Sequence, residues 1–94
     1  MTMAQIYLPT SLRRLTAGQA TVAADGRTVD EALADLERRY PGLRDQLREP
    51  TGEVRQFINI FVNGTEIRTL QGSATPLHER DEISIIPAMA GGKG

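Results

Sequence analysis

A β-hairpin in the second half of the chain constrains the fold more than any other feature. Residues 57–62 are rich in β-branched and aromatic side chains, which favour strands. Asn63 and Gly64 follow, and both tolerate the positive φ angles that the two central residues of a type I′ turn require. The sequence therefore predicts an antiparallel hairpin whose second strand covers residues 65–68.

The alternation of side chains in the first hairpin strand predicts its two faces. Ile58, Ile60 and Val62 share one face, which we expect to point into the core. Phe61 is expected on the opposite, open face with Phe57, because a sheet face without a helix often contacts a partner protein. The alternative, that a loop covers Phe61, stays open at this point.

One helix is expected over residues 29–40. Thr28 and Glu31 form a capping-box pattern at its start, and Pro41-Gly42 ends it. Its apolar positions recur at helical spacing and predict a buried stripe: Val29, Ala32, Leu33, Leu36 and Tyr40.

Two strands are expected before this helix. Residues 5–8 alternate between polar and apolar side chains and stop at Pro9, as a first strand would. Residues 10–19 are interpreted as a loop. Residues 20–24 predict a weaker second strand that leads into a turn.

The remaining segments predict one short helix and a last strand. Residues 43–48 fit one or two helical turns, and residues 70–80 read as a connection with a turn near 75–78. Residues 82–86 predict the last strand, whose pairing we expect to end at Pro87. This order predicts an α+β domain, a mixed sheet of about five strands with one main helix across one face and little room for a pocket.

Composition excludes several classes of protein. The 94 residues make one small domain, and the absence of cysteine excludes disulfides, a thiolate metal site and a cysteine nucleophile. Eleven basic and twelve acidic residues with 4% aromatics leave no basic stripe for nucleic acid. With no apolar run of membrane length and no leader-like start, we expect a soluble cytoplasmic protein with no metal and no bound cofactor.

The end of the sequence combines an apolar tail with two glycines. Ala88, Met89 and Ala90 are small or pliable, which suits a segment gripped along its backbone. Gly91 and Gly92 lack Cβ atoms and can pass through a narrow channel as an extended chain. We therefore divide the chain into a domain of residues 1–88 and a flexible tail of residues 89–94. A frayed end or a cloning remnant is the alternative.

Several segments in this order resemble a known family. They are Leu8-Pro9 with Leu12-Arg13, Thr28-Val29, Leu36-Glu37, Tyr40-Pro41-Gly42-Leu43, residues 57–64, residues 81–87 and Ala90-Gly91-Gly92. Together they are similar to the ubiquitin-like β-grasp sulfur carriers of the MoaD and ThiS family, and most similar to its CysO-type branch. The resemblance covers nearly the whole chain and implies a ubiquitin-like β-grasp fold.

The resemblance implies a function for the tail. In this family an E1-like enzyme of the MoeB and ThiF type uses ATP to adenylate the second glycine, which corresponds to Gly92. The adenylate becomes a thiocarboxylate that donates sulfur through a downstream synthase to cysteine, a cofactor or a sulfur-containing metabolite. The carrier is then a protein cosubstrate and not an enzyme, and the tail that enters partner active sites includes Pro87 and Ala88 to Gly91.

Two positions depart from the family pattern. Lys93 and Gly94 follow the diglycine, so Gly92 has no free carboxylate in the sequence as written. A proform trimmed between Gly92 and Lys93 by a metallopeptidase is the favoured explanation; a cloning remnant and a member without the chemistry are the others. Arg80 stands where the family usually has glycine, which predicts strain if that turn needs a positive φ angle.

Two other functions stay open, and a chemical role for the single histidine is set aside. A ubiquitin-like modifier would use the same activation but join Gly92 to lysines of other proteins, and a β-grasp binding subunit would never be activated. The single histidine, His78, is expected to be a solvated loop residue and not a base or a ligand.

Overall fold

Five strands form one mixed sheet in the computed structural model, which describes residues 2–87. The strand order is β2-β1-β5-β3-β4. The central strand β5 is parallel to its neighbour β1, and every other neighbouring pair is antiparallel. The bounds are β1 (Met3–Tyr7), β2 (Thr21–Asp25), β3 (Ile58–Val62), β4 (Thr65–Glu66) and β5 (Glu82–Pro87).

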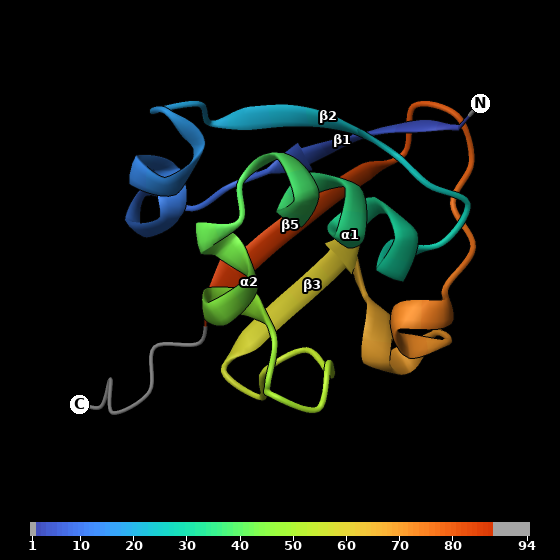
Figure 1. Ribbon diagram of the computed structural model, residues 1–94. Coiled ribbons are helices and arrows are strands. Elements are labelled where there is room, and N and C mark those ends of the chain that lie inside the picture. Colours follow the sequence, from blue (N-terminus) through green and yellow to red (C-terminus); the bar gives the residue numbers. More distant parts are fainter. Residues whose placement is uncertain (1, 88–94) are drawn as a thin grey trace.

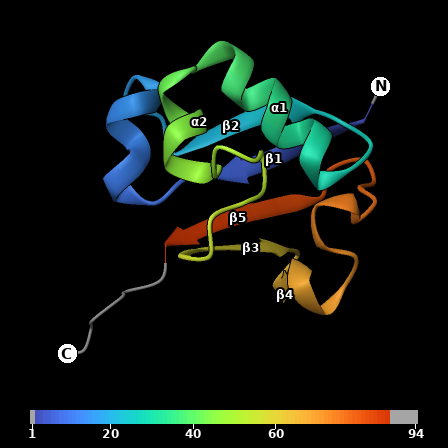
Figure 2. The same ribbon diagram turned by 60° about the horizontal axis from the view of Figure 1, so that its bottom comes forward.

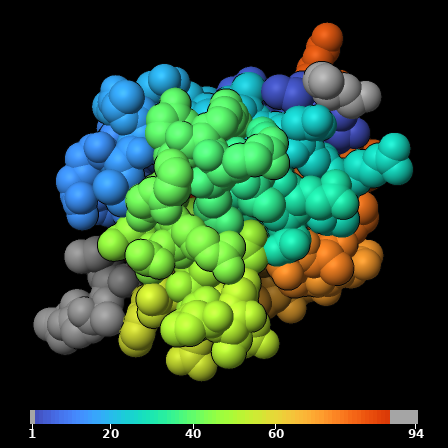
Figure 3. Space-filling model, in the orientation of Figure 1, coloured from blue at the N-terminus to red at the C-terminus, as the bar shows by residue number. Residues whose placement is uncertain are grey.

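Both α-helices lie on one side of this sheet (Figure 1 and Figure 2). In Figure 3 the green side chains of the helices fill the middle of this side, between blue and orange segments. These segments contain short 3₁₀ helices. The helices are α1 (Val29–Arg39), α2 (Gly42–Leu47), η1 (Thr10–Thr16), η2 (Ile67–Thr69) and η3 (Gly72–Ala74). The predicted α+β class, with one main helix across a five-stranded sheet, is confirmed.

The core lies between α1 and the inner face of the sheet. Alternate residues of each strand point inward, and the central ones are essentially without solvent exposure. Burial of each such aliphatic side chain contributes about 1.5–3 kcal/mol. The predicted inward set of β3 and most of the helical stripe are confirmed as core, together with residues of β1 and β5: Ile6, Val29, Leu33, Leu36, Ile58, Ile60, Val62, Ile83 and Ile85.

The start of α1 is fixed by two side chains. Oγ1 of Thr28 accepts a hydrogen bond from the backbone N–H of Glu31 at 3.2 Å, as the capping pattern predicts. The Glu31 carboxylate accepts from the backbone N–H of Arg27 at 2.9 Å, one residue earlier than in the standard capping box. Both bonds satisfy backbone donors that would otherwise lack partners.

The loop predicted for residues 10–19 is wrong, because η1 occupies residues 10–16. Leu12 is buried against the core and anchors this short helix. The buried Thr16 hydroxyl lies 3.1 Å from the carbonyl of Arg13 and 2.9 Å from that of Gln19, which closes the end of the helix. These tertiary contacts explain the ordered turn where the local sequence indicates only a loop.

Three boundaries in the second half differ from expectation. The second hairpin strand ends at Glu66, since η2 begins at Ile67 and buries that side chain. The helical turn expected near residues 75–78 lies earlier, at residues 72–74. The last strand is one residue longer than predicted, because Pro87 is itself the last residue of β5 and is aligned with Ile58.

The turn before β5 contains the positive φ angle that the sequence raised as a possibility. Arg80 has φ 71°, in the left-handed region. Asp81 secures this turn by accepting hydrogen bonds from the backbone N–H of His78 at 2.8 Å and from the Asn63 side chain at 3.0 Å. Burial raises the pKa of the Asp81 carboxyl, but these bonds outweigh burial, so the pKa lies below its usual value.

Replacing Arg80 with glycine should stabilise the protein. Glycine adopts a positive φ angle without the steric cost of a Cβ atom, although it adds freedom to the unfolded chain. We expect Arg80→Gly to raise the free energy of unfolding by about 0.5–1 kcal/mol, measured by urea denaturation. Arg80→Ala, which keeps the Cβ atom, is the control and should give no gain; an equal gain in both variants would contradict the strain.

A buried ion cluster joins α1 to α2 and the loop that follows. Nε of Arg48 lies 2.9 Å from Oε2 of Glu37, and Nη1 lies 2.7 Å from Oδ1 of Asp30 and 2.9 Å from the carbonyl oxygen of Gly52. The side chains of Arg48 and Glu37 are only 7% and 5% exposed. Burial lowers the pKa of the guanidinium, but the hydrogen bonds to Asp30 and Glu37 outweigh it and raise the pKa, so Arg48 stays charged.

Candidate functional site

The C-terminal end of β5 lies at the centre of one end of the sheet. Its last residue, Pro87, stands beside the start of β3. Because β1 runs parallel to β5, the C-terminal end of β1 and the start of η1 lie at this same end (Figure 1 and Figure 2). Any segment after Pro87 therefore leaves from the middle of the sheet.

The tail residues predicted as functional lie outside the described residues. They are Ala88, Met89, Ala90, Gly91, Gly92 and Lys93. The predicted boundary between domain and tail after residue 88 lies there too. Pro87 is the one predicted tail residue that the structure describes, and it belongs to β5.

Apolar side chains gather on the outer face of the sheet, opposite the helices. Tyr7, Phe57 and Ile86 are 41%, 60% and 48% exposed, and Phe61 is half-buried. Strand register places Tyr7, Ser84 and Phe61 in one row across β1, β5 and β3. Tyr7, Phe57, Phe61 and Ile86 are called the outer patch below.

Polar groups border the outer patch along β3. Arg68 donates through Nη1 to Oδ1 of Asn59 at 3.0 Å and through Nη2 to the carbonyl oxygen of Ile58 at 3.1 Å. Asn59 is aligned with Ile86 across the strand pair. Arg68 thus holds the β3 edge of the outer patch in place while its own guanidinium stays partly exposed.

Sequence reasoning found half of the outer patch. Phe61 and Phe57 were predicted for the open face. The alternation in β3 confirms this face for the half-buried Phe61, and Phe57, one residue before β3, is 60% exposed; contact of either with a partner stays a prediction. Tyr7 and Ile86 were not singled out. Ile86 was derivable, since an alternating strand with Ile83 and Ile85 inward must point its neighbour outward.

The structure separates His78 from the end where the tail begins. His78 lies before β5, at the opposite end of that strand from Pro87, and its side chain is exposed. Nδ1 lies 3.8 Å from the Asp81 carboxylate. The solvated loop position expected for His78 is confirmed.

A cavity of about 170 Å³ opens on the inner side of β3, opposite the outer patch. Its apolar lining comes from Val54, Ile58, Ile60 and Ile67, and Glu53, Glu66 and Arg68 contribute polar groups. The sequence predicted little room for a pocket, and this small, open cavity is consistent with that expectation. No helix within residues 2–87 is both long enough and apolar enough to cross a membrane.

Comparison with known proteins decides the family. The sequence model of the ThiS family matches residues 6–92, which is nearly the whole chain. The chain belongs to the ThiS family. The match ends at Gly92 and leaves Lys93 and Gly94 outside the family pattern.

Individual ThiS-family relatives agree with this assignment. The sulfur carrier protein CysO of Mycobacterium tuberculosis is 39% identical over 89 residues, which cover 93% of this chain and 96% of that protein. CysO in the BexX/CysO complex of Amycolatopsis orientalis superposes with a TM-score of 0.87 at 34% identity, over 94% of this chain and 98% of that chain.

A second similar structure carries a different name. The small archaeal modifier protein SAMP1 of Methanosarcina acetivorans superposes with a TM-score of 0.86 at 33% identity, over 97% of both chains. These neighbours confirm the ubiquitin-like β-grasp fold. Sulfur carriers of the ThiS family are substrate proteins, so the prediction that this chain is not an enzyme is also confirmed.

Proposed function

We propose that this protein is a sulfur carrier that works through the carboxylate of Gly92. One observation carries the proposal: the ThiS-family match spans the domain and ends at the second glycine. The placement of Pro87 at the centre of the sheet end supports it, because residues 88–92 would leave the domain there. Fully extended, those residues span roughly 17 Å, enough to enter a channel in an enzyme.

The proposed chemistry needs no side chain of the carrier. The Gly92 carboxylate attacks the α-phosphorus of ATP, pyrophosphate leaves, and an acyl-adenylate forms on an E1-like enzyme of the MoeB and ThiF type. A hydrosulfide ion then attacks the acyl carbon, AMP leaves, and one proton is released. The product is a thiocarboxylate, which transfers its sulfur on a downstream synthase. A chain without cysteine can therefore donate sulfur.

Removal of Lys93-Gly94 must precede this chemistry. Hydrolysis of the Gly92–Lys93 peptide bond consumes one water molecule and releases the carboxylate that ATP activates. We assign this step to a metallopeptidase. The end of the family match at Gly92 supports a cleavage at that bond.

Reconstitution tests the proposal directly. The chain ending at Gly92 is incubated with ATP, sulfide and the E1-like enzyme of the same organism, and its intact mass is measured. We expect a product about 16 Da heavier, because sulfur replaces one oxygen. The enzyme is first shown to thiocarboxylate another carrier as a positive control. An unchanged mass of this chain with that active enzyme would overturn the proposal.

We propose that the outer patch docks the activating enzyme. Ile86 lies next to Pro87, so a partner that covers it is already beside the tail. Ile86→Asp should lower kcat/KM for adenylation about tenfold, as for a central interface residue, while stability stays nearly constant. Leu70→Asp is the matched control, since Leu70 is 46% exposed but lies between η2 and η3. Equal losses in both variants would contradict a specific surface.

The likeness to small archaeal modifier proteins favours one second function, conjugation of Gly92 to lysines of other proteins. All cationic side chains in residues 1–92 are arginine, and Lys93 is the single lysine. Trypsin would therefore leave residues 81–92 attached to an acceptor lysine. Detection of that remnant on cellular proteins would support the modifier, and thiocarboxylate without any remnant would support the carrier alone.

A further inference from the structure

Charge is divided unequally between the two ends of the sheet. Carboxylates gather at the end where β5 begins, because β2 ends there, α1 begins there and the loop into β5 lies there. They are Asp25, Asp30, Glu31, Glu79, Asp81 and Glu82, and they outnumber the arginines of the same end, Arg27 and Arg80. At the end where β5 finishes at Pro87, the neighbouring β1 and η1 carry no carboxylate, and the loop before β3 carries Glu49, which pairs with Arg55, and Glu53.

The segment next to that end carries positive charge alone. Residues 2–24 contain no carboxylate, and their only charged side chains are Arg13 and Arg14 of η1. Since β1 is parallel to β5 and aligns Tyr7 with Ser84, the start of η1 lies close to the level of Pro87. The two arginines therefore stand at the end from which the tail departs.

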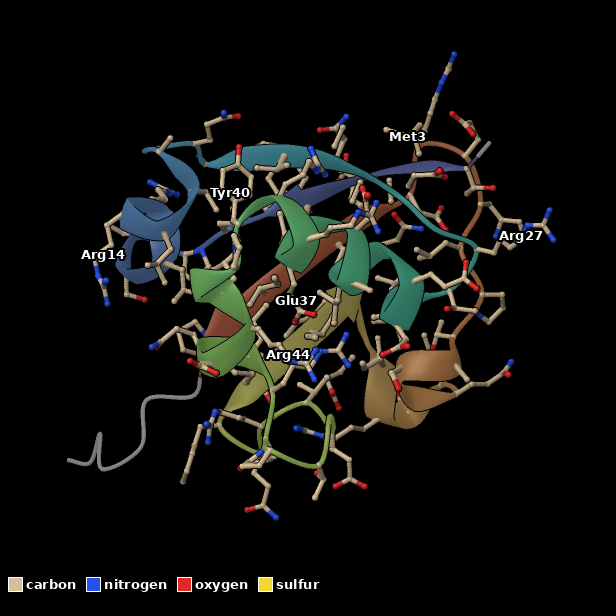
Figure 4. All side chains as sticks on the ribbon, viewed as in Figure 1. Met3, Arg14, Arg27, Glu37, Tyr40 and Arg44 are labelled. Carbon is tan, nitrogen blue, oxygen red and sulfur yellow. The ribbon has the colours of Figure 1, made fainter. Side chains whose placement is uncertain are left out.

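Neither arginine forms an ion pair within the described part of the chain. Nε of Arg13 donates to the carbonyl oxygen of Leu8 at 3.1 Å, which fixes its stem. Arg14 is exposed and makes no side-chain hydrogen bond to residues 2–87 (Figure 4). By contrast, Arg38 and Arg39 at the end of α1 both pair with Asp35. Two guanidinium groups thus remain for a partner's carboxylates.

We propose that Arg13 and Arg14 form a docking surface for an acidic protein surface beside the active-site entrance of the activating enzyme. This inference rests on the proposed function and adds a recognition element outside the outer patch. The opposite charges of the two ends orient the carrier so that its tail end approaches an acidic surface first. Arginine suits this role, because its planar fork binds carboxylates in a bidentate manner.

The charge pattern favours a protein partner over a nucleic acid. Two arginines neutralise only about two phosphates, which contributes little to binding a polyanion at physiological salt. The acidic end and the net charge of −1 oppose such a partner further. A few well-placed carboxylates of an enzyme are sufficient for two guanidinium groups.

A charge reversal with a matched control tests this surface. Arg14→Glu is compared with Arg27→Glu, which changes the net charge equally at the other end of the molecule (Figure 4). Arg27 is also exposed and its side chain makes no ion pair among residues 2–87. Dissociation constants of the chain ending at Gly92 from the MoeB or ThiF-type enzyme are measured without ATP, at low and high salt.

We expect Arg14→Glu to weaken binding about tenfold at low salt, with a smaller effect at high salt because salt screens exposed charges. Arg27→Glu should stay within about twofold. Equal effects of both variants, no effect of Arg14→Glu, or an effect independent of salt would overturn the docking surface. So would tight binding of a single-stranded oligonucleotide that Arg14→Glu abolishes.

This measurement separates the inference from the proposed function. Salt-dependent binding that Arg14→Glu weakens, without any adenylate when ATP is added, would leave the docking surface standing and overturn activation at Gly92. Adenylation of Arg14→Glu at the normal rate, with unchanged affinity for the enzyme, would support activation at Gly92 and overturn the docking surface. Absence of any binding by the unaltered chain would overturn the docking surface whatever the fate of the tail.

Discussion

Removing Lys93 and Gly94 is expected to convert the chain from an inactive form into a substrate of the activating enzyme. In the full sequence the Gly92 carbonyl belongs to a peptide bond, so its carboxylate is not available to attack ATP. The chain ending at Gly92 should form the adenylate, measured as ATP–pyrophosphate exchange. The full-length chain should stay at the background rate, a loss of at least 100-fold, because the reacting atom is misplaced.

A shortened chain provides the matched control for this prediction. A chain ending at Gly91 also ends in a glycine carboxylate, but it is shorter by about 3.5 Å. Gly92→Ala in the trimmed chain keeps the length and adds a Cβ atom in the channel. Both should exchange at least tenfold more slowly than the chain ending at Gly92. Equal exchange by the full-length chain, or by the chain ending at Gly91, would contradict a role specific to Gly92.

Arg48→Ala is expected to be the most destabilising single change outside the aliphatic core. It removes the partner of Glu37 and leaves that carboxylate buried without its guanidinium. It also removes the bonds to Asp30 and to the Gly52 carbonyl, which hold the loop after α2. The cost of breaking a buried pair on one side is about 3–5 kcal/mol, and we expect a loss of that size in the free energy of unfolding by urea denaturation.

Two variants show whether the loss of stability comes from the unpaired carboxylate of Glu37. Nη1 of Arg44 lies 3.9 Å from Oε1 of the same Glu37, but the Arg44 side chain is 60% exposed. Arg44→Ala should therefore lower the free energy of unfolding by less than about 1 kcal/mol. The double variant Arg48→Met with Glu37→Leu replaces both charges by apolar groups and should recover most of the loss. A double variant as unstable as Arg48→Ala would instead point to the loop contacts.

The sequence predicted correctly the turns, caps and strands that depend on a pattern of a few neighbouring residues. Asn63 and Gly64 have φ angles of 50° and 88°, as the type I′ turn requires. The cap at Thr28 and the alternation of β3 and β5 are also local, and the structure agrees with both. These features depend on backbone sterics and side-chain period, which a single sequence contains.

Long-range contacts account for most of what the sequence did not indicate. The turn of η1 depends on burial of Leu12 and Thr16, and a segment of seven residues is too short for its apolar spacing to indicate a helix. Glu37 lies on α1 and Arg48 directly follows the end of α2, eleven positions later, so no local spacing predicts their pairing. The early end of β4 follows from burial of Ile67, which competes with continued strand pairing.

For the candidate site, the sequence provides a hypothesis for the chemistry, which stays a prediction because Gly91 and Gly92 lie outside the described residues, and it indicates only part of the surface. Gly91 and Gly92 pointed to a threaded tail through their lack of a Cβ atom, and the resemblance added activation at Gly92. Phe61 was assigned from alternation. The contribution of Tyr7 required the parallel pairing of β1 with β5, which brings together the two ends of the domain and could not be established from either segment alone.

Intact mass spectrometry of the untagged protein from its own cells tests the central claim most directly. The account predicts a chain that ends at Gly92, part of it about 16 Da heavier than the free carboxylate, because one sulfur replaces one oxygen at the terminus. If the full chain with Lys93 and Gly94 attached were the sole form detected in cells with active sulfur assimilation, that result would contradict the account.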